Sequence, residues 1–180
     1  MKLSLKKILT IVAGAIAILT FILAFVAPLK YEIAGVSGVL KAKDVYFGES
    51  GIAVMVKQKP VYFQAGAIVP FIGYILIALA GVLLIVRRLL NGTNSEIFIL
   101  IIALMVIGAA LVLLTEILYV SNLIGAKGLS TATEAEVKAN NAEKVLFHAL
   151  SLNTGAIIAI ILALVAVTLA IVAEHYIKEK

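Results

Sequence analysis

Four long stretches almost free of charge limit what this chain can fold into. They cover residues 8–27, 65–86, 97–120 and 155–173, and Glu116 is the only charged residue in them. About 20 apolar residues, each rising about 1.5 Å along a helix, match a hydrocarbon core of about 30 Å. Inside lipid the backbone must satisfy its own hydrogen bonds, so we predict four transmembrane helices.

The composition excludes several classes of protein. Apolar residues make up 63% of the chain and charged residues 14%, whereas soluble domains average about 45–50% and about 25%. The absence of Cys excludes a disulfide framework, a thiolate nucleophile and a Cys-ligated metal, and we predict no cofactor. The net charge of +5 is too scattered for a surface that follows nucleic-acid phosphates.

The distribution of cations predicts the orientation in the membrane. Segments 1–7, 87–96 and 174–180 hold 7 cations in 24 residues, and loops 28–64 and 121–154 hold 8 Lys in 71 residues. Cations concentrated close to the spans favour the cytoplasmic side. We therefore predict a multi-pass protein of the cell membrane with both termini cytoplasmic.

The two loops predicted outside the cell differ in pattern. Loop 28–64 alternates β-branched and aromatic residues with turn signals, which predicts strands at 39–47, 52–56 and 61–64 and an additional edge strand at 31–33. Loop 121–154 carries a capping box and an apolar stripe, which predict a short helix at 131–152. That helix would cover the sheet or lie on the outer bilayer surface. The residues expected to make outer-loop contacts are Tyr46, Phe47, Tyr62 and Phe63.

The predicted fold class is therefore an all-α membrane protein. It is a four-helix transmembrane bundle, residues 1–180 forming one domain, with a small extracytoplasmic β-sheet from loop 28–64 and the outer helix at 131–152.

Small residues form a seam along the first and the last predicted span. Both seams have the spacing 3, 4, 3, 4, 3, which lets two helices approach closely at a small crossing angle. We expect the two spans to pack antiparallel along these seams; the alternative is a contact between subunits. Gly73, Gly81 and Gly108 are interpreted as further points of close packing. The seam residues are Thr10, Ala13, Ala17, Thr20, Ala24 and Ala27 in the first span, and Ala156, Ala159, Ala163, Ala166, Ala170 and Ala173 in the last.

Ionisable residues inside a membrane are functional candidates by default. Glu116 follows Ile97 by 19 positions, or about 28 Å of helix, which places it near the outer interface. We interpret it as a structural anchor that pairs with a lysine, a tyrosine or the loop backbone, with ion or ligand binding as the alternative. Tyr119, one turn later, fits an interfacial aromatic residue.

The order of these parts resembles the claudin-like tetraspan group. That group also has four spans, inner termini, a β-rich first outer loop and a smaller second one. The resemblance covers the whole chain as architecture, and loop 28–64 contains neither the Trp nor the Cys of the group's signature, so no functional residue is carried over. Thirteen Lys against two Arg, with no Cys, resembles the composition of a low-GC bacterium.

The sequence contains no catalytic motif and no polar break in the middle of a span. The leading hypothesis is a non-enzymatic membrane scaffold that presents a β-rich domain for self-association or for complex formation. Its partners would be the lipid bilayer and either further copies of the chain or another membrane protein. The alternative is a subunit of an oligomeric channel or transporter, and a membrane enzyme or its accessory subunit is the third hypothesis.

Overall fold

The computed structural model describes residues 4–26, 28–33, 36–47, 52–56, 59–63, 67–90, 92–119 and 150–176. The chain divides into two compact units. One, the helical unit, comprises Met1–Leu23, Ile72–Val112 and Ile158–Lys180. The other, the sheet unit, comprises Ala24–Phe71 and Leu113–Ile157.

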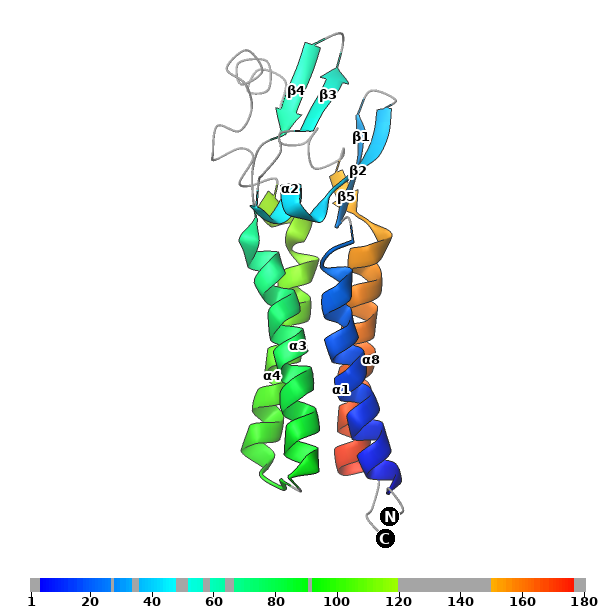
Figure 1. The fold of residues 1–180 in the computed structure, drawn as a ribbon, viewed down its shortest axis with the longest axis vertical. Coiled ribbons are helices and arrows are strands. Elements are labelled where there is room, and N and C mark those ends of the chain that lie inside the picture. Colours follow the sequence, from blue (N-terminus) through cyan, green and yellow to red (C-terminus); the bar gives the residue numbers. More distant parts are fainter. Residues whose placement is uncertain are drawn as a thin grey trace. The chain divides into compact units, whose positions relative to one another are not determined.

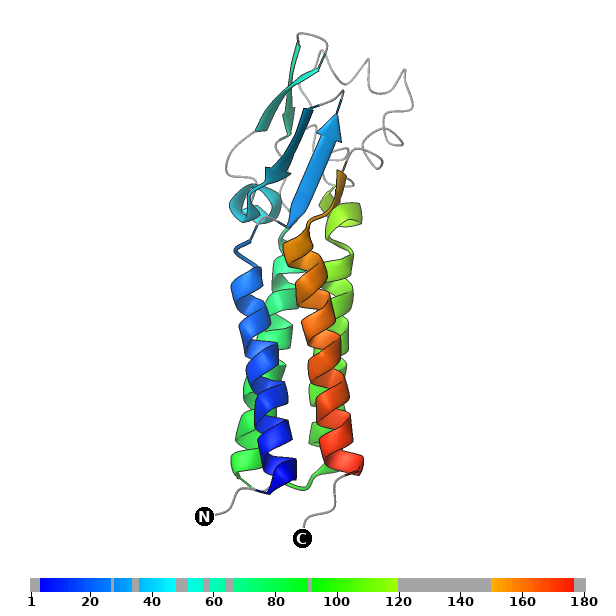
Figure 2. The ribbon, with the colours of Figure 1, turned by 90° about the vertical axis from the view of Figure 1, so that its right-hand side faces the viewer.

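Four helices supply the helical unit: α1 (Leu5–Leu23), α3 (Ile68–Leu89), α4 (Ser95–Leu113) and α8 (Thr154–His175). Each of the four is long and apolar enough to cross a membrane, and together they fit the predicted tetraspan architecture. In Figures 1 and 2, α1 lies beside α8 and α3, and α4 lies beside α3 and α8. The first turn of α1 and the last turn of α8 are at the same end, because Lys6 contacts Glu174. We call this the terminal end of the bundle.

A side-chain cap determines where α4 begins. The Oδ1 atom of Asn94 accepts hydrogen bonds from the backbone N–H groups of Glu96 at 2.8 Å and Ile97 at 3.4 Å. These donors have no partner inside the helix, and Asn is among the best residues for satisfying them. The connection from α3 to α4 is consequently short, which keeps the two helices antiparallel neighbours.

Glycines bring the backbones of neighbouring helices into contact at two places. A Cβ built on Gly73 would lie 2.6 Å from the carbonyl oxygen of Gly108, and one built on Gly108 would lie 2.6 Å from that of Gly73. The pair Gly14 and Gly81 joins α1 to α3 in the same way, at 2.7 and 2.6 Å. No residue with a side chain fits at these distances, so glycine is required.

The two small-residue seams are buried. The seam of α1 is 0 to 3% exposed from Thr10 to Ala24, and every seam alanine of α8 is at most 1% exposed; Ala27 lies outside the described residues. The antiparallel neighbours α1 and α8 therefore each turn their small residues inward. The seam of α1 also faces α3, because the Cβ of Ala17 would be 2.9 Å from a Cβ built on Gly81.

Two small antiparallel sheets and one short helix form the described part of the sheet unit. The strands are β1 (Leu29–Ile33), β2 (Val36–Leu40), β3 (Ile52–Val56), β4 (Lys59–Phe63) and β5 (Leu150–Leu152), and the helix is α2 (Ala42–Phe47). One sheet has the order β2-β1-β5, and the other pairs β3 with β4. Figures 1 and 2 show β1 between β2 and the short β5.

The prediction of a strand through 42–47 is wrong, because these residues form α2. Three consecutive residues, Asp44, Val45 and Tyr46, are buried there, whereas Lys43 and Phe47 are exposed. A strand with one packed face and one water-facing side would bury only alternate side chains, which this pattern does not match. The Lys41 carbonyl accepts the N–H groups of both Asp44 and Val45, which starts the helical turn.

The prediction of a helix at 131–152 is wrong at its end, because Leu150–Leu152 is the strand β5; residues 121–149 lie outside the described residues. β5 pairs with β1, opposite Leu29, Lys30 and Tyr31. This pairing satisfies the second side of β1 and makes 31–33 part of the central strand instead of an edge. Asn153 N–H continues the ladder to the Pro28 carbonyl at 2.9 Å.

We predict that Gly108→Ala destabilises the protein, although alanine favours helix by about 1 kcal/mol. The added methyl group would meet a backbone carbonyl that cannot rotate away, and overpacking of this kind costs about 1–3 kcal/mol. The net result should be a lower thermal unfolding midpoint in detergent. Ala110→Val is the control, because Ala110 is an exposed residue of the same helix and should tolerate the extra carbon atoms. Equal midpoints for Gly108→Ala and the wild type would contradict the backbone contact.

Candidate functional site

The three-stranded sheet has one buried face and one exposed face. The register places Leu40, Leu29 and Leu152 in one row, and Val39, Lys30 and Ser151 in the next. Leu29 and Leu40 are fully buried, and Leu150 is 2% exposed. In the other row Lys30 and Val39 are exposed. The alternation is that of a sheet with a packed side and a water-facing side.

Gly38 in the middle of β2 leaves space for the side chain of Tyr31. Gly38 is opposite Tyr31 in the register, and a Cβ built on Gly38 would lie 2.5 to 2.8 Å from three atoms of the Tyr31 ring and hydroxyl. Any other residue would displace the tyrosine. The ring of Tyr31 therefore crosses β2 at Gly38 and helps to fix the register of this pair.

Strand β2 lies at the edge of the described sheet. Among the described strands its only neighbour is β1. Edge strands of stable monomers usually carry a lysine, a proline or a bulge that prevents another strand from adding. The sequence of β2 is Val-Ser-Gly-Val-Leu, which has neither charge nor proline, and Val39 is 53% exposed. This edge is the first candidate interaction surface.

Glu116 lies beyond α4, in a second helical segment at 115–119. Burial raises the pKa of its carboxyl group, and a backbone hydrogen bond from Leu152 acts in the opposite direction. Leu152 belongs to β5, so the carboxylate accepts its bond from the sheet. A hydrogen bond from the backbone of this outer segment is the kind of contact that the anchor interpretation expects, and ion or ligand binding stays the alternative.

Tyr119 is fully buried. Burial is the main cause that raises the pKa of its phenol, and the negative charge of Asp44 raises it further. Its hydroxyl has no hydrogen-bond partner within the described part of the chain. Tyr119 and Asp44 of α2 therefore lie within electrostatic range of each other inside the sheet unit.

The four residues predicted to make outer-loop contacts lie in two different elements, β4 and α2. β4 carries Tyr62 opposite Ala53 and Phe63 opposite Ile52. Tyr46 and Phe47 end α2, where Tyr46 is buried and Phe47 is 48% exposed.

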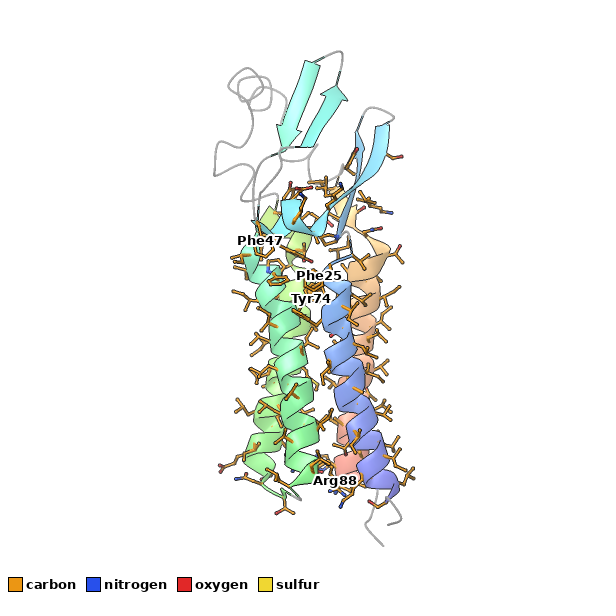
Figure 3. All side chains as sticks on the ribbon, viewed as in Figure 1. Phe25, Phe47, Tyr74 and Arg88 are labelled. Atoms are coloured by element: carbon orange, nitrogen blue, oxygen red, sulfur yellow. The ribbon has the colours of Figure 1, made fainter. Side chains whose placement is uncertain are left out.

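Phe47 joins two further rings that the sequence did not single out. Its ring centroid is 5.3 Å from that of Phe71, and Phe71 is 6.2 Å from Phe25. We call Phe25, Phe47 and Phe71 the aromatic patch; Figure 3 labels Phe25 and Phe47.

A network of charged groups connects three helices at the terminal end of the bundle. Arg87 of α3 donates from Nη2 to Oε1 of Glu174 in α8 at 2.6 Å, and Lys6 Nζ of α1 lies 3.5 Å from Oε2. Lys6 also donates to the Glu174 carbonyl at 3.2 Å. The Arg87 guanidinium lies 5.1 Å from the centre of the Phe98 ring, in cation–π range. One carboxylate thus holds α1, α3 and α8 together.

Sequence reasoning missed this network. It counted Arg87 and Arg88 only among the cations of segment 87–96, yet both are less than 8% exposed, and Figure 3 shows Arg88 at this end of the bundle. The available signal was Glu174, an acid directly after an uncharged span and next to basic termini.

Among the described residues, no three His, Asp or Glu side chains gather as metal ligands would.

Comparisons of the chain with family models, curated proteins and solved structures found no match. The candidate functional features of the described residues are therefore the edge strand, the aromatic patch and the charged network.

We predict that Glu174→Gln lowers the free energy of unfolding by about 3 kcal/mol, because a buried cation that loses its partner is strongly destabilising. The Arg87 side chain is 5% exposed, so water cannot replace the carboxylate. Chemical denaturation in detergent measures the difference. Glu96→Gln removes an acid that is exposed on α4 and should leave stability within about 0.5 kcal/mol of the wild type. Equal effects of the two substitutions would show that the network contributes little.

Proposed function

We propose that this chain is a non-enzymatic integral membrane protein that assembles with further copies of itself through the free edge of β2. The helical unit would anchor each copy in the bilayer. The sheet unit would present the edge outside the cytoplasm.

The observation that carries this proposal is the β2 edge, which has one neighbour among the described strands and neither charge nor proline in its sequence. An added strand would satisfy the outward backbone groups of β2 and cover Val39, while the exposed Lys30 in the neighbouring strand keeps that face soluble. Pairing through main-chain groups needs no catalytic residues and no metal. Assembly is therefore the activity that this geometry supports best.

The charge distribution supports an orientation with the terminal end of the bundle in the cytoplasm. Lys6 and Lys7 lie in the first turn of α1, and Arg87 and Arg88 lie in the last turn of α3. Cations flanking membrane spans favour the cytoplasmic side. Strands β1 and β2 follow the opposite end of α1 in the chain, so the sheet unit would be extracytoplasmic.

We predict that Val39→Glu weakens self-association at least tenfold. A charge at a free edge opposes strand addition, and the fold should tolerate it because Val39 is exposed and opposite Lys30. Native mass spectrometry and single-molecule photobleaching in lipid nanodiscs or vesicles would measure the distribution of oligomers.

Lys30→Gln is the matched control for this experiment. It changes the net charge by the same amount on the same face of the sheet, but its site is the central strand β1. It should assemble like the wild type. A wild-type protein that is monomeric at all lipid-to-protein ratios would overturn the proposal, as would assembly that Val39→Glu leaves intact.

We predict opposite labelling of two single-cysteine variants, since the natural chain has no Cys. Ser37 in β2 and Thr93 between α3 and α4 are both exposed. In intact cells, a membrane-impermeant maleimide should label Ser37→Cys and should reach Thr93→Cys only after permeabilisation. The reverse pattern would refute the proposed orientation and leave the edge-pairing experiment unaffected.

A further inference from the structure

We propose that the aromatic patch and Lys43 bind a phospholipid of the leaflet in which α1 ends and α3 begins. The rings would contact the upper part of an acyl chain, and the Lys43 ammonium group would pair with the phosphate. This inference does not depend on assembly through β2.

The positions of Phe25 and Phe71 in the chain place the patch at the ends of two predicted membrane helices. Phe25 is two residues beyond the last residue of α1, and Phe71 is the fourth residue of α3. The third ring comes from α2, whose Val45 carbonyl accepts the N–H of Ala67 at 2.7 Å. Ala67 directly precedes α3. All three rings therefore belong to the level at which the spans meet the headgroup region.

Two of the three rings expose a large apolar area, which is unfavourable on a surface that faces water. Phe25 is 65% exposed and Phe47 is 48% exposed, yet each is in contact with Phe71, so the three form one continuous apolar surface. Large aromatic side chains prefer the zone between headgroups and acyl chains. A phospholipid would cover this surface without requiring another protein.

The charge beside the patch matches a phosphate group. Lys43 precedes Phe47 by four residues in α2, so the two share one face of the helix, and both are exposed. The acid between them, Asp44, is 4% exposed and lies on the inward face. An exposed ammonium group on the same helix face as an exposed aromatic ring fits the headgroup and the acyl chain of one lipid molecule.

The experiment uses single tryptophans, because the natural chain has no Trp. Phe47→Trp reports on the patch, and Phe25→Trp is a second reporter in case the first variant folds poorly. Lys30→Trp, exposed on β1, is the aqueous reference, and Ile107→Trp, at a residue of α4 that is 51% exposed, is the deep reference. Each full-length protein is placed in vesicles whose lipids are brominated either near the headgroup or near the end of the acyl chain.

We expect Phe47→Trp to be quenched at least twofold more by shallow bromines than Lys30→Trp, with Ile107→Trp responding most to deep bromines. Two results would overturn the proposal. If acrylamide in the buffer quenches Phe47→Trp as fully as Lys30→Trp, the patch faces water. If neither lipid nor aqueous quenchers reach either patch reporter, protein covers the patch, for example a second copy of the chain.

The phosphate contact is tested in the same Phe47→Trp protein. Vesicles of phosphatidylglycerol should quench it more than vesicles of phosphatidylcholine when both carry shallow bromines, and Lys43→Gln should reduce that difference at least twofold. Inorganic phosphate added to the protein in neutral detergent should leave the emission unchanged. A change with inorganic phosphate equal to that with lipid would replace the lipid site with a site for free anions, and an unaltered lipid preference in Lys43→Gln would remove Lys43 from the site.

Discussion

Contact between helix backbones is the interaction on which this structure depends. Lipid tails are as apolar as the side chains of a membrane helix, so the hydrophobic effect does not drive helices together inside a bilayer. Helices in lipid associate instead through close van der Waals contact and through polar groups. The outward residues of the four spans are large and apolar, and Ile99, Leu100 and Ile161 are all more than 50% exposed. Cohesion must therefore come from inside the bundle. The two reciprocal glycine pairs and the two buried seams supply it.

Polar contacts at the terminal end add direction to this packing. Small-residue seams permit close approach of two helices but only weakly fix their relative position along the helix axis. A helix can slide along a regular seam by one repeat. The Glu174 carboxylate is held by Arg87 and by Lys6 at the same time. Sliding α8 by one turn would separate these groups by about 5.4 Å and leave Arg87 buried without its carboxylate. The network thus fixes the register that the seams leave open.

The periodic parts of the fold could be predicted from sequence, and the parts decided by distant contacts could not. Four apolar stretches and two small-residue seams are local patterns, so their helices and their burial follow from the residues themselves. Segment 42–47 has the β-branched and aromatic residues of a strand, but the burial of Asp44 within electrostatic range of Tyr119 depends on residues more than 70 positions away. Strand β5 forms because it pairs with β1. No local pattern in Leu-Ser-Leu predicts that pairing.

The candidate surfaces follow the same division. The sequence predicts 31–33 as the edge strand, whereas in the described sheet β2 lies at the edge, because β5 from the second loop pairs with the other side of β1. The aromatic patch joins residues after α1, at the end of α2 and at the start of α3, so the sequence separates what the fold brings together.

An edge strand without charge or proline, such as β2 in the described sheet, is less hazardous in a membrane protein than in a soluble one. Lipid confines the copies to one layer and restricts their tilt, so random collisions in solution do not occur. The same confinement raises the effective concentration of one edge around another. In the proposed assembly, an edge of five residues, too short to hold two soluble domains together, would then join neighbouring copies reversibly.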